Sequence, residues 1–142
     1  MTQRYMLDTN IVSHIMQGRD AGLLAQLSQI PVGQAVMSSV TLAELEYGLH
    51  RKGQPEGLKN ALYQVLLRMD VLPWDQPAAR CYGRLCCALE AQGINMTDLD
   101  MMIAAQCVAT DPMLVSRDKA FQTVASIAPK TLLPDTFRLE VW

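Results

Sequence analysis

The sequence predicts an α/β protein with a mainly parallel central sheet covered by helices. Short apolar runs at residues 4–7, 35–40 and 113–116 have the length and composition of buried strands. Each run is followed by a segment in which apolar residues recur at helical spacing. Repeated strand–helix units favour parallel strands, because the helix returns the chain to the start of the next strand. The 142 residues contain no internal repeat or linker, so we expect one domain, residues 1–142.

The first two strand–helix units carry the clearest helix signals. After the first strand, Thr9 or Asn10 can cap a helix with four apolar residues on one face. After the second strand, we expect a helix from Thr41 to about Lys52, which Gly53 would end. Strand-to-helix turns therefore lie near residues 8 and 41.

The middle of the chain predicts two helices, 56–69 and 76–92, separated by turn residues around Pro73 and Pro77. We interpret this pair as an insertion into the strand–helix series. The C-terminal part predicts a helix capped by Thr97, then a strand, another helix and two strand-like segments. Their expected bounds are 97–110, 113–116, 118–125, 131–133 and 137–141.

Composition and charge restrict the function classes. No apolar run approaches the roughly 20 residues needed to cross a bilayer, and the first residues lack the pattern of a secretory signal. We therefore expect a soluble, cytoplasmic protein with no membrane contact. The formal net charge of -2 does not favour a broad basic surface that binds nucleic acid by electrostatics alone. Any contact with nucleic acid should therefore be local or metal-mediated. The four cysteines and two histidines show no zinc-site spacing, and we expect reduced thiols in the core.

Acidic residues lie where the predicted parallel strands end. Asp8 and Asp118 follow strands directly, and Glu44 and Asp100 lie in the first turns of predicted helices. Ligands of open α/β sheets collect at the carboxyl edge of the strands, so four acids from distant segments can meet there. Carboxylates in such a cluster repel one another unless a cation neutralises them. Mg²⁺ and Mn²⁺ prefer oxygen ligands and promote phosphodiester cleavage, which is the reaction class that we infer.

Each acid also has a structural interpretation. Asp8 and Asp118 could be ordinary charges or caps at helix starts. Glu44 completes a capping box with Thr41, in which the two side chains satisfy each other's backbone donors. The argument for a site therefore depends on the set of acids and not on any one of them.

Four segments carry a shared pattern that extends along essentially the whole chain, as far as residues 139–142. They are 7–10 (LDTN), 38–45 (SSVTLAEL) with Gly48, 100–105 (DMMIAA), and 114–118 (LVSRD) with Phe121. In order and spacing this set resembles the VapC toxin family of PIN-domain proteins. The resemblance implies a PIN-like three-layer α/β/α sandwich and an endoribonuclease that depends on Mg²⁺ or Mn²⁺. It also implies the toxin of a toxin–antitoxin pair, which a VapB-like antitoxin neutralises. Further implications are self-association as a homodimer and an RNA substrate for which transfer RNA is the first candidate.

The resemblance assigns the acids residue by residue. The family's catalytic and metal-binding acids fall on Asp8, Glu44 and Asp100, and the more variable fourth acid falls on Asp118. Ser116 matches a frequently hydroxylic position beside the metal site.

Two positions depart from the common family pattern. Many relatives have proline where this chain has Asp98, and asparagine is frequent at the position of Arg117. Asp98 and Asn10 could support the metal ligands from behind, or Asp98 could be only a charge at a helix start. Arg117 and Lys119 could hold the RNA backbone, although charges at a helix start are often simply solvated.

Two other functions remain open from the sequence. An acidic-pocket phosphatase is one, but the Asp-x-Asp pair of the common haloacid-type phosphatases is replaced here by Asp8-Thr9-Asn10. A noncatalytic PIN-fold binding module is the other, and the presence of all four acids argues against it. Cleavage of structured RNA but not of small phosphoesters would separate these functions.

Overall fold

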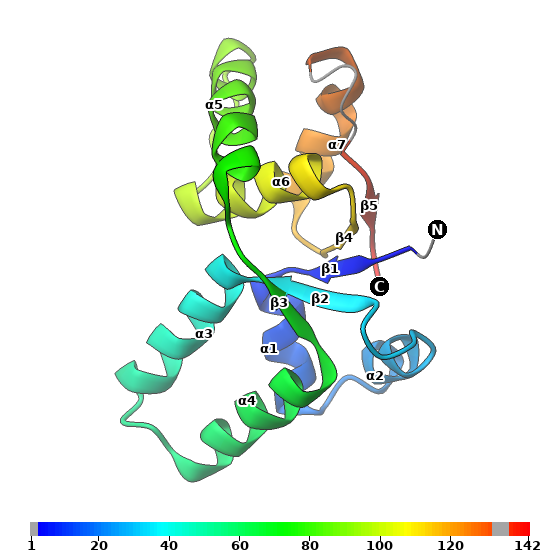
Figure 1. Ribbon diagram of the computed structural model, residues 1–142, viewed down its shortest axis with the longest axis vertical. Helices are drawn as coiled ribbons and strands as arrows, with labels where there is room; N and C mark the ends of the chain where they lie inside the picture. The colour runs from blue at the N-terminus through cyan, green and yellow to red at the C-terminus, as the bar shows by residue number, and fades with distance from the viewer. Residues whose placement is uncertain (1–2, 132–136) are drawn as a thin grey trace.

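The computed structural model describes residues 3–131 and 137–142, with residues 127–131 described as backbone only. A sheet of five parallel strands lies between two groups of helices (Figure 1). The strand order is β3-β2-β1-β4-β5, so the first strand of the chain is the central one. The strands are β1 (Tyr5–Leu7), β2 (Ala35–Ser38), β3 (Asp70–Leu72), β4 (Met113–Val115) and β5 (Leu139–Glu140). The predicted three-layer α/β/α architecture is confirmed.

Helices cover both faces of the sheet. One face carries α1 (Thr9–Gln17), α2 (Ala21–Ser28), α3 (Ser39–Arg51) and α4 (Glu56–Arg68), and the other carries α5 (Gln76–Ala91), α6 (Asp98–Thr110) and α7 (Lys119–Thr131) (Figure 1). Successive strand residues alternate between two cores: Met6 packs with α5, α6 and α7, whereas Leu7 packs with α1 to α4. Because both faces of the sheet are buried, the three central strands β1, β2 and β4 are almost continuously apolar, and this pattern predicts them from the sequence.

The N-terminal half differs from the prediction in two places. The side chain of Asp8, and not that of Thr9 or Asn10, caps α1 by accepting a hydrogen bond from the N–H of Ile11. Helix α2 was not predicted, because its buried side chains are few. Its start is nevertheless marked by Asp20, whose carboxylate accepts a hydrogen bond from a backbone N–H three residues later.

The two middle helices are not an insertion, so that prediction is wrong. Between them lies β3, which pairs in parallel with β2, with Val36 opposite Asp70 and Ser38 opposite Leu72. Helix α4 is therefore the crossover that brings the chain back to the sheet edge. The strand was missed because it has only three residues and is followed at once by the turn residue Pro73.

The C-terminal half follows the prediction more closely. Thr97 caps α6 as expected, and α7 extends past the expected end at residue 125 to Thr131. Apart from Thr131, the strand expected at 131–133 lies outside the described residues. All four cysteines are free thiols, as predicted, but only two are in the core, since Cys86 is partly buried and Cys87 is exposed. None of the helices in the described ranges is long and apolar enough to span a bilayer.

Candidate active site

The adjacency of β1 and β4 brings together the residues that follow these two strands. Leu7 pairs with Val115, and the backbone N–H of Asp8 donates a 3.1 Å hydrogen bond to the carbonyl of Val115. The turn that contains Ser116 and Asp118 therefore starts beside Asp8. This meeting at the carboxyl edge of the two central strands is the arrangement expected from the sequence.

Asp8 is a buried carboxylate with two donors. The residue is only 3% exposed. Its Oδ1 accepts a 2.9 Å hydrogen bond from the N–H of Ile11, and its Oδ2 accepts a 2.5 Å hydrogen bond from the hydroxyl of Ser116. The Ser116 oxygen in turn accepts the Asp118 N–H at 3.0 Å. The Asp118 carboxylate accepts the Ala120 N–H at 2.9 Å. This network fixes the orientation of Asp8 and the course of the turn that leads to Asp118.

Three carboxylates lie within electrostatic reach of one another at this edge. Burial raises the pKa of Asp8, the hydrogen bonds from Ser116 and the Ile11 N–H oppose that rise, and the charges of Asp100 and Asp118 add to it. Burial also raises the pKa of Asp100, a hydrogen bond with a neighbouring threonine opposes the rise, and the charge of Asp118 adds to it. The acids from β1, α6 and the turn after β4 are thus brought together.

Glu44 is linked to the residue after Asp8, and it is not among the carboxylates whose charges act on Asp8 or Asp100. Helix α3 begins after Ser38, whose hydroxyl caps it, so Glu44 lies in the second turn and not in the first turn as predicted. The alternative interpretation of Glu44 as part of a capping box with Thr41 is therefore wrong. The carboxylate of Glu44 instead accepts a 2.7 Å hydrogen bond from the hydroxyl of Thr9, the residue after Asp8. The Thr9 hydroxyl also lies 3.2 Å from that of the buried Thr41. Glu44 is therefore connected to the start of α1.

Of the two acids in the first turn of α6, only Asp100 lies toward the cluster. Asp98 lies near Tyr82 of α5 instead. The pKa of Tyr82 is raised by its hydrogen bond with Cys86, by burial, and by nearby negative charges that include Asp98. Asp98 is exposed, and it is not among the carboxylates that act on Asp8 or Asp100. The two residues diverge because positions two apart on a helix do not face the same way.

The remaining predicted residues surround the turn after β4. Asn10 is exposed in the first turn of α1, and Lys119 is exposed at the start of α7. Arg117 has intramolecular partners that were not anticipated: Nη1 lies 2.8 Å from the Asp20 carboxylate, and Nε donates to the backbone oxygen of Trp142 at 2.7 Å. Its guanidinium is therefore anchored to the start of α2 and to the last residue of the chain.

The sequence predicted Thr9 only as a possible helix cap and gave no role to Asp20. Each is a hydroxyl or carboxylate side chain at the start of a helix, and this signal marks both residues. Their partners could not be predicted, because Glu44 is 35 positions from Thr9 and Arg117 is far along the chain from Asp20.

The donor set at this edge fits a hard divalent cation. All the side chains involved present oxygen atoms. Burial raises the pKa of Asp8 and the charges of Asp100 and Asp118 add to that rise, and a positive ion would offset both effects. Among the described residues, no three acidic, histidine or cysteine side chains are close enough to form a complete cage. Mg²⁺ is commonly held by only one or two carboxylates, with waters and substrate phosphate completing its shell. The arrangement therefore suits an ion that is shared with a substrate.

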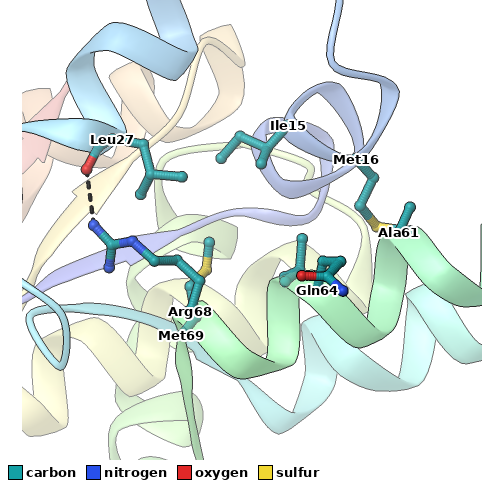
Figure 2. Close-up of a pocket in the computed structure, with 8 residues that line it drawn as sticks. Ile15, Met16, Leu27, Ala61, Gln64, Arg68 and Met69 are labelled. Atoms are coloured by element: carbon teal, nitrogen blue, oxygen red, sulfur yellow. Dashed lines mark hydrogen bonds between the residues drawn. The ribbon is translucent and has the colours of Figure 1, made fainter.

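A separate pocket of about 200 Å³ lies between α1, α2 and α4 (Figure 2). It is lined by Ile15, Met16, Leu27, Ala61, Gln64, Val65, Arg68 and Met69. In Figure 2 the guanidinium of Arg68 reaches across to the carbonyl of Leu27, a 2.9 Å hydrogen bond at the end of α2. The pocket lining contains no acidic side chain, so this pocket lacks the groups that phosphodiester cleavage needs.

The wholly parallel sheet with acids at its central carboxyl edge defines an α/β protein of the PIN type. The model of the PIN domain family matches residues 5–127, and the chain belongs to this family, among its VapC ribonucleases. It is 31% identical over 125 residues to Ribonuclease VapC2 of Haemophilus influenzae, covering 87% of this chain and 94% of that protein. It is 30% identical over 125 residues to the tRNA(fMet)-specific endonuclease VapC of Shigella flexneri, with coverages of 87% and 94%. The solved structure of VapBC-1 from nontypeable Haemophilus influenzae superposes with a TM-score of 0.80 at 26% identity, covering 99% of this chain and 98% of that one.

Proposed function

We propose that this chain is a divalent-metal-dependent endoribonuclease in which Asp8, Glu44, Asp100 and Asp118 hold Mg²⁺ or Mn²⁺, directly or through water. The observation that carries the proposal is the state of Asp8. Its carboxylate is almost completely buried, yet it faces the negative charges of Asp100 and Asp118 at the carboxyl edge of the sheet. A purely structural role does not explain why one carboxylate is buried against two others, because their repulsion lowers the stability of the folded state.

The residues of this chain have distinct roles in the proposed site. Each oxygen of Asp8 accepts one hydrogen bond, from Ile11 or Ser116, and retains a lone pair for a cation because a carboxylate offers about four acceptor positions. Ser116 orients Asp8 and the turn that carries Asp118, and Thr9 orients Glu44. When bound, a divalent cation supplies Lewis-acid chemistry, since it polarises phosphoryl oxygens and lowers the pKa of water.

Transfer RNA is the substrate class that we propose. The support is the relative from Shigella flexneri whose name specifies tRNA(fMet), together with the net charge of -2, which leaves no broad basic surface for indiscriminate binding of nucleic acid. A shape-dependent RNA substrate held locally at the acidic edge is consistent with both observations.

A VapB-like antitoxin is the partner that we propose, and the chain would act as the toxin of that pair. The support is the similarity to VapBC-1, a structure whose name includes both components. We also propose that the chain forms a homodimer and works in the cytoplasm, as the resemblance to VapC toxins implies.

The test is metal binding and RNA cleavage by Asp8→Asn and Asp100→Asn. Purified proteins are titrated with Mn²⁺ in a calorimeter and are then assayed on total transfer RNA with Mg²⁺, with Mn²⁺ and with a chelator. Both variants should lose detectable cleavage and bind Mn²⁺ at least tenfold more weakly, because each loses a negatively charged oxygen ligand. Circular dichroism should show unchanged secondary structure.

Asp70→Asn is the matched control, because it makes the same chemical change on an exposed residue at the amino end of β3. It should bind Mn²⁺ and cleave RNA like the wild type. Full cleavage by Asp8→Asn or Asp100→Asn, or wild-type cleavage that persists in chelator, would refute the metal assignment. Hydrolysis of small phosphoesters without RNA cleavage would favour the phosphatase alternative.

A further inference from the structure

A small pocket lies directly beside the acidic cluster. It has a volume of about 210 Å³ and is lined by Asn10, Ile11, His14, Arg117 and Asp118. Three of these residues come from one side of α1, and two come from the turn after β4. Since Asp118 belongs both to the pocket and to the acidic cluster, a group in the pocket would be next to the site of cleavage. We call it the α1 pocket.

Two of the residues that line the α1 pocket, Ile11 and Arg117, are held in place by contacts outside it. Ile11 is 1% exposed, and its N–H is bound to Asp8. Arg117 is anchored by Asp20 and by the backbone oxygen of Trp142, on two different segments. A pocket whose walls are fixed before binding loses little entropy when a ligand enters.

The charges around the α1 pocket disfavour a phosphate group. The positive charge of Arg117 is already paired with Asp20, at 2.8 Å, and Asp118 contributes a further negative charge. Asn10 presents an amide with both donors and an acceptor, and His14 presents an exposed flat ring. These groups match the edge and the face of an uncharged nucleobase, which proteins recognise in single-stranded RNA by hydrogen bonding and stacking.

The size of the α1 pocket agrees with one ring-sized group. Pockets that hold drug-sized ligands have volumes of roughly 300–1,000 Å³, and about 210 Å³ is below that range. We propose that the α1 pocket holds a single unstacked base of the RNA, adjacent to the bond that is cut. The proposal rests on the proposed ribonuclease function and adds a contact that selects the cleavage position.

The test combines RNAs that lack one base with protein variants that lack the side chains proposed to contact that base. The cleavage position is first mapped in initiator transfer RNA. Oligonucleotides spanning this position are then prepared with one abasic nucleotide at each neighbouring position in turn. Loss of the accommodated base should lower kcat/KM by roughly tenfold at one position, as expected when about 1.4 kcal/mol of contact is lost.

Asn10→Ala and His14→Ala should each lower kcat/KM on the intact RNA by roughly three- to tenfold. On the abasic RNA they should cause no further loss, because the contact is already gone. His50→Ala is the matched control, since His50 is also an exposed helical histidine but lies on α3, with Glu46 as its partner at 3.7 Å. It should leave cleavage of every substrate unchanged.

Three results would overturn the proposal. Wild-type cleavage that is insensitive to every abasic position, or variant effects that add fully to the abasic effect, would show that no base occupies the pocket. Variants that cleave all RNAs normally but escape inhibition by the antitoxin would make the pocket a protein contact. If the wild type cleaves no RNA at all, the ribonuclease function itself fails and this subsite fails with it.

Discussion

The Ser116 hydroxyl donates a 2.5 Å hydrogen bond to Oδ2 of Asp8, across 108 positions of sequence. The same hydroxyl oxygen accepts the backbone N–H of Asp118 at 3.0 Å. The side chain of Ser116 therefore orients both Asp8, after β1, and the turn that carries Asp118, after β4. Groups that orient metal ligands in this way strongly influence metal affinity and activity.

Ser116→Ala should reduce activity and shift its dependence on pH. The hydrogen bond from Ser116 lowers the pKa of Asp8 and opposes the effect of burial, so its loss should raise that pKa further. The acidic limb of the profile of kcat/KM against pH should move to higher pH. Because Asp8 and the Asp118 N–H lose a partner, the free energy of unfolding should fall by about 1–3 kcal/mol in urea titrations. Ser126→Ala, at an exposed position of α7, is the control, and an unshifted pH profile in Ser116→Ala would contradict the assigned role.

Asp100→Asn should stabilise the fold at neutral pH while abolishing cleavage. The pKa values of Asp8 and Asp100 are raised above 3.8 in the folded state, so between 3.8 and the raised values the folded state binds more protons than the unfolded state. Stability is then highest at acidic pH and falls as pH rises through this window. In chelator, the thermal unfolding midpoint of Asp100→Asn should exceed that of the wild type at pH 7, and the difference should shrink toward pH 4. Equal midpoints at pH 7 would show that burial and the charge of Asp118 do not destabilise the ionised form of Asp100.

Thr9→Val should weaken the site without disturbing the core. Valine has nearly the same shape as threonine, but it cannot donate the 2.7 Å hydrogen bond to Glu44. We expect Mn²⁺ affinity to fall by roughly 10-fold, within the 10–100-fold range seen when a group behind a metal ligand is lost. Thr9→Ser restores the hydroxyl and should recover most of the affinity in calorimetry. Thr123→Val, on the exposed side of α7, should have no effect, and an equal loss in that variant would contradict the interpretation.

Arg68→Met should loosen α2. One nitrogen of the Arg68 guanidinium donates to the carbonyls of Leu27 and Ile30 at the end of that helix. Its Nη1 is buried without a hydrogen bond among the described residues, so removal of the guanidinium also relieves a cost. We therefore expect a net loss of only about 1 kcal/mol in the free energy of unfolding, but much faster hydrogen exchange in α2. Arg80→Met, at an exposed position of α5, should change neither quantity, and unchanged exchange in α2 would remove this role from Arg68.

The sequence could predict the sheet because its central strands are continuously apolar and their helices are periodic. It could not predict β3, because three residues at a sheet edge carry too little pattern; their register depends on β2, more than 30 positions away. Helix α2 could not be predicted for a related reason, because its only strong sequence signal is the capping residue Asp20.

The acids themselves were identified from the sequence, but their surroundings were not. The sequence spacing of Thr41 and Glu44 fits a capping box, but the helix begins earlier, at Ser39, and the hydroxyl of Ser38 caps it. Which of two possible caps is used depends on where β2 ends, and that is set by pairing with β1 and β3. The partners of Arg117 were equally hidden, because Asp20 and Trp142 become neighbours only in the folded chain.

The position of β1 at the centre of the sheet also affects synthesis of the protein. Asp8 is made before β4, the strand on one side of β1, and before Ser116 and Asp118, which act on its carboxylate. A nascent chain that stops short of these residues has Asp8 without the hydroxyl of Ser116 that orients it and without Asp118. Incomplete translation products that end before Ser116 should therefore lack ribonuclease activity.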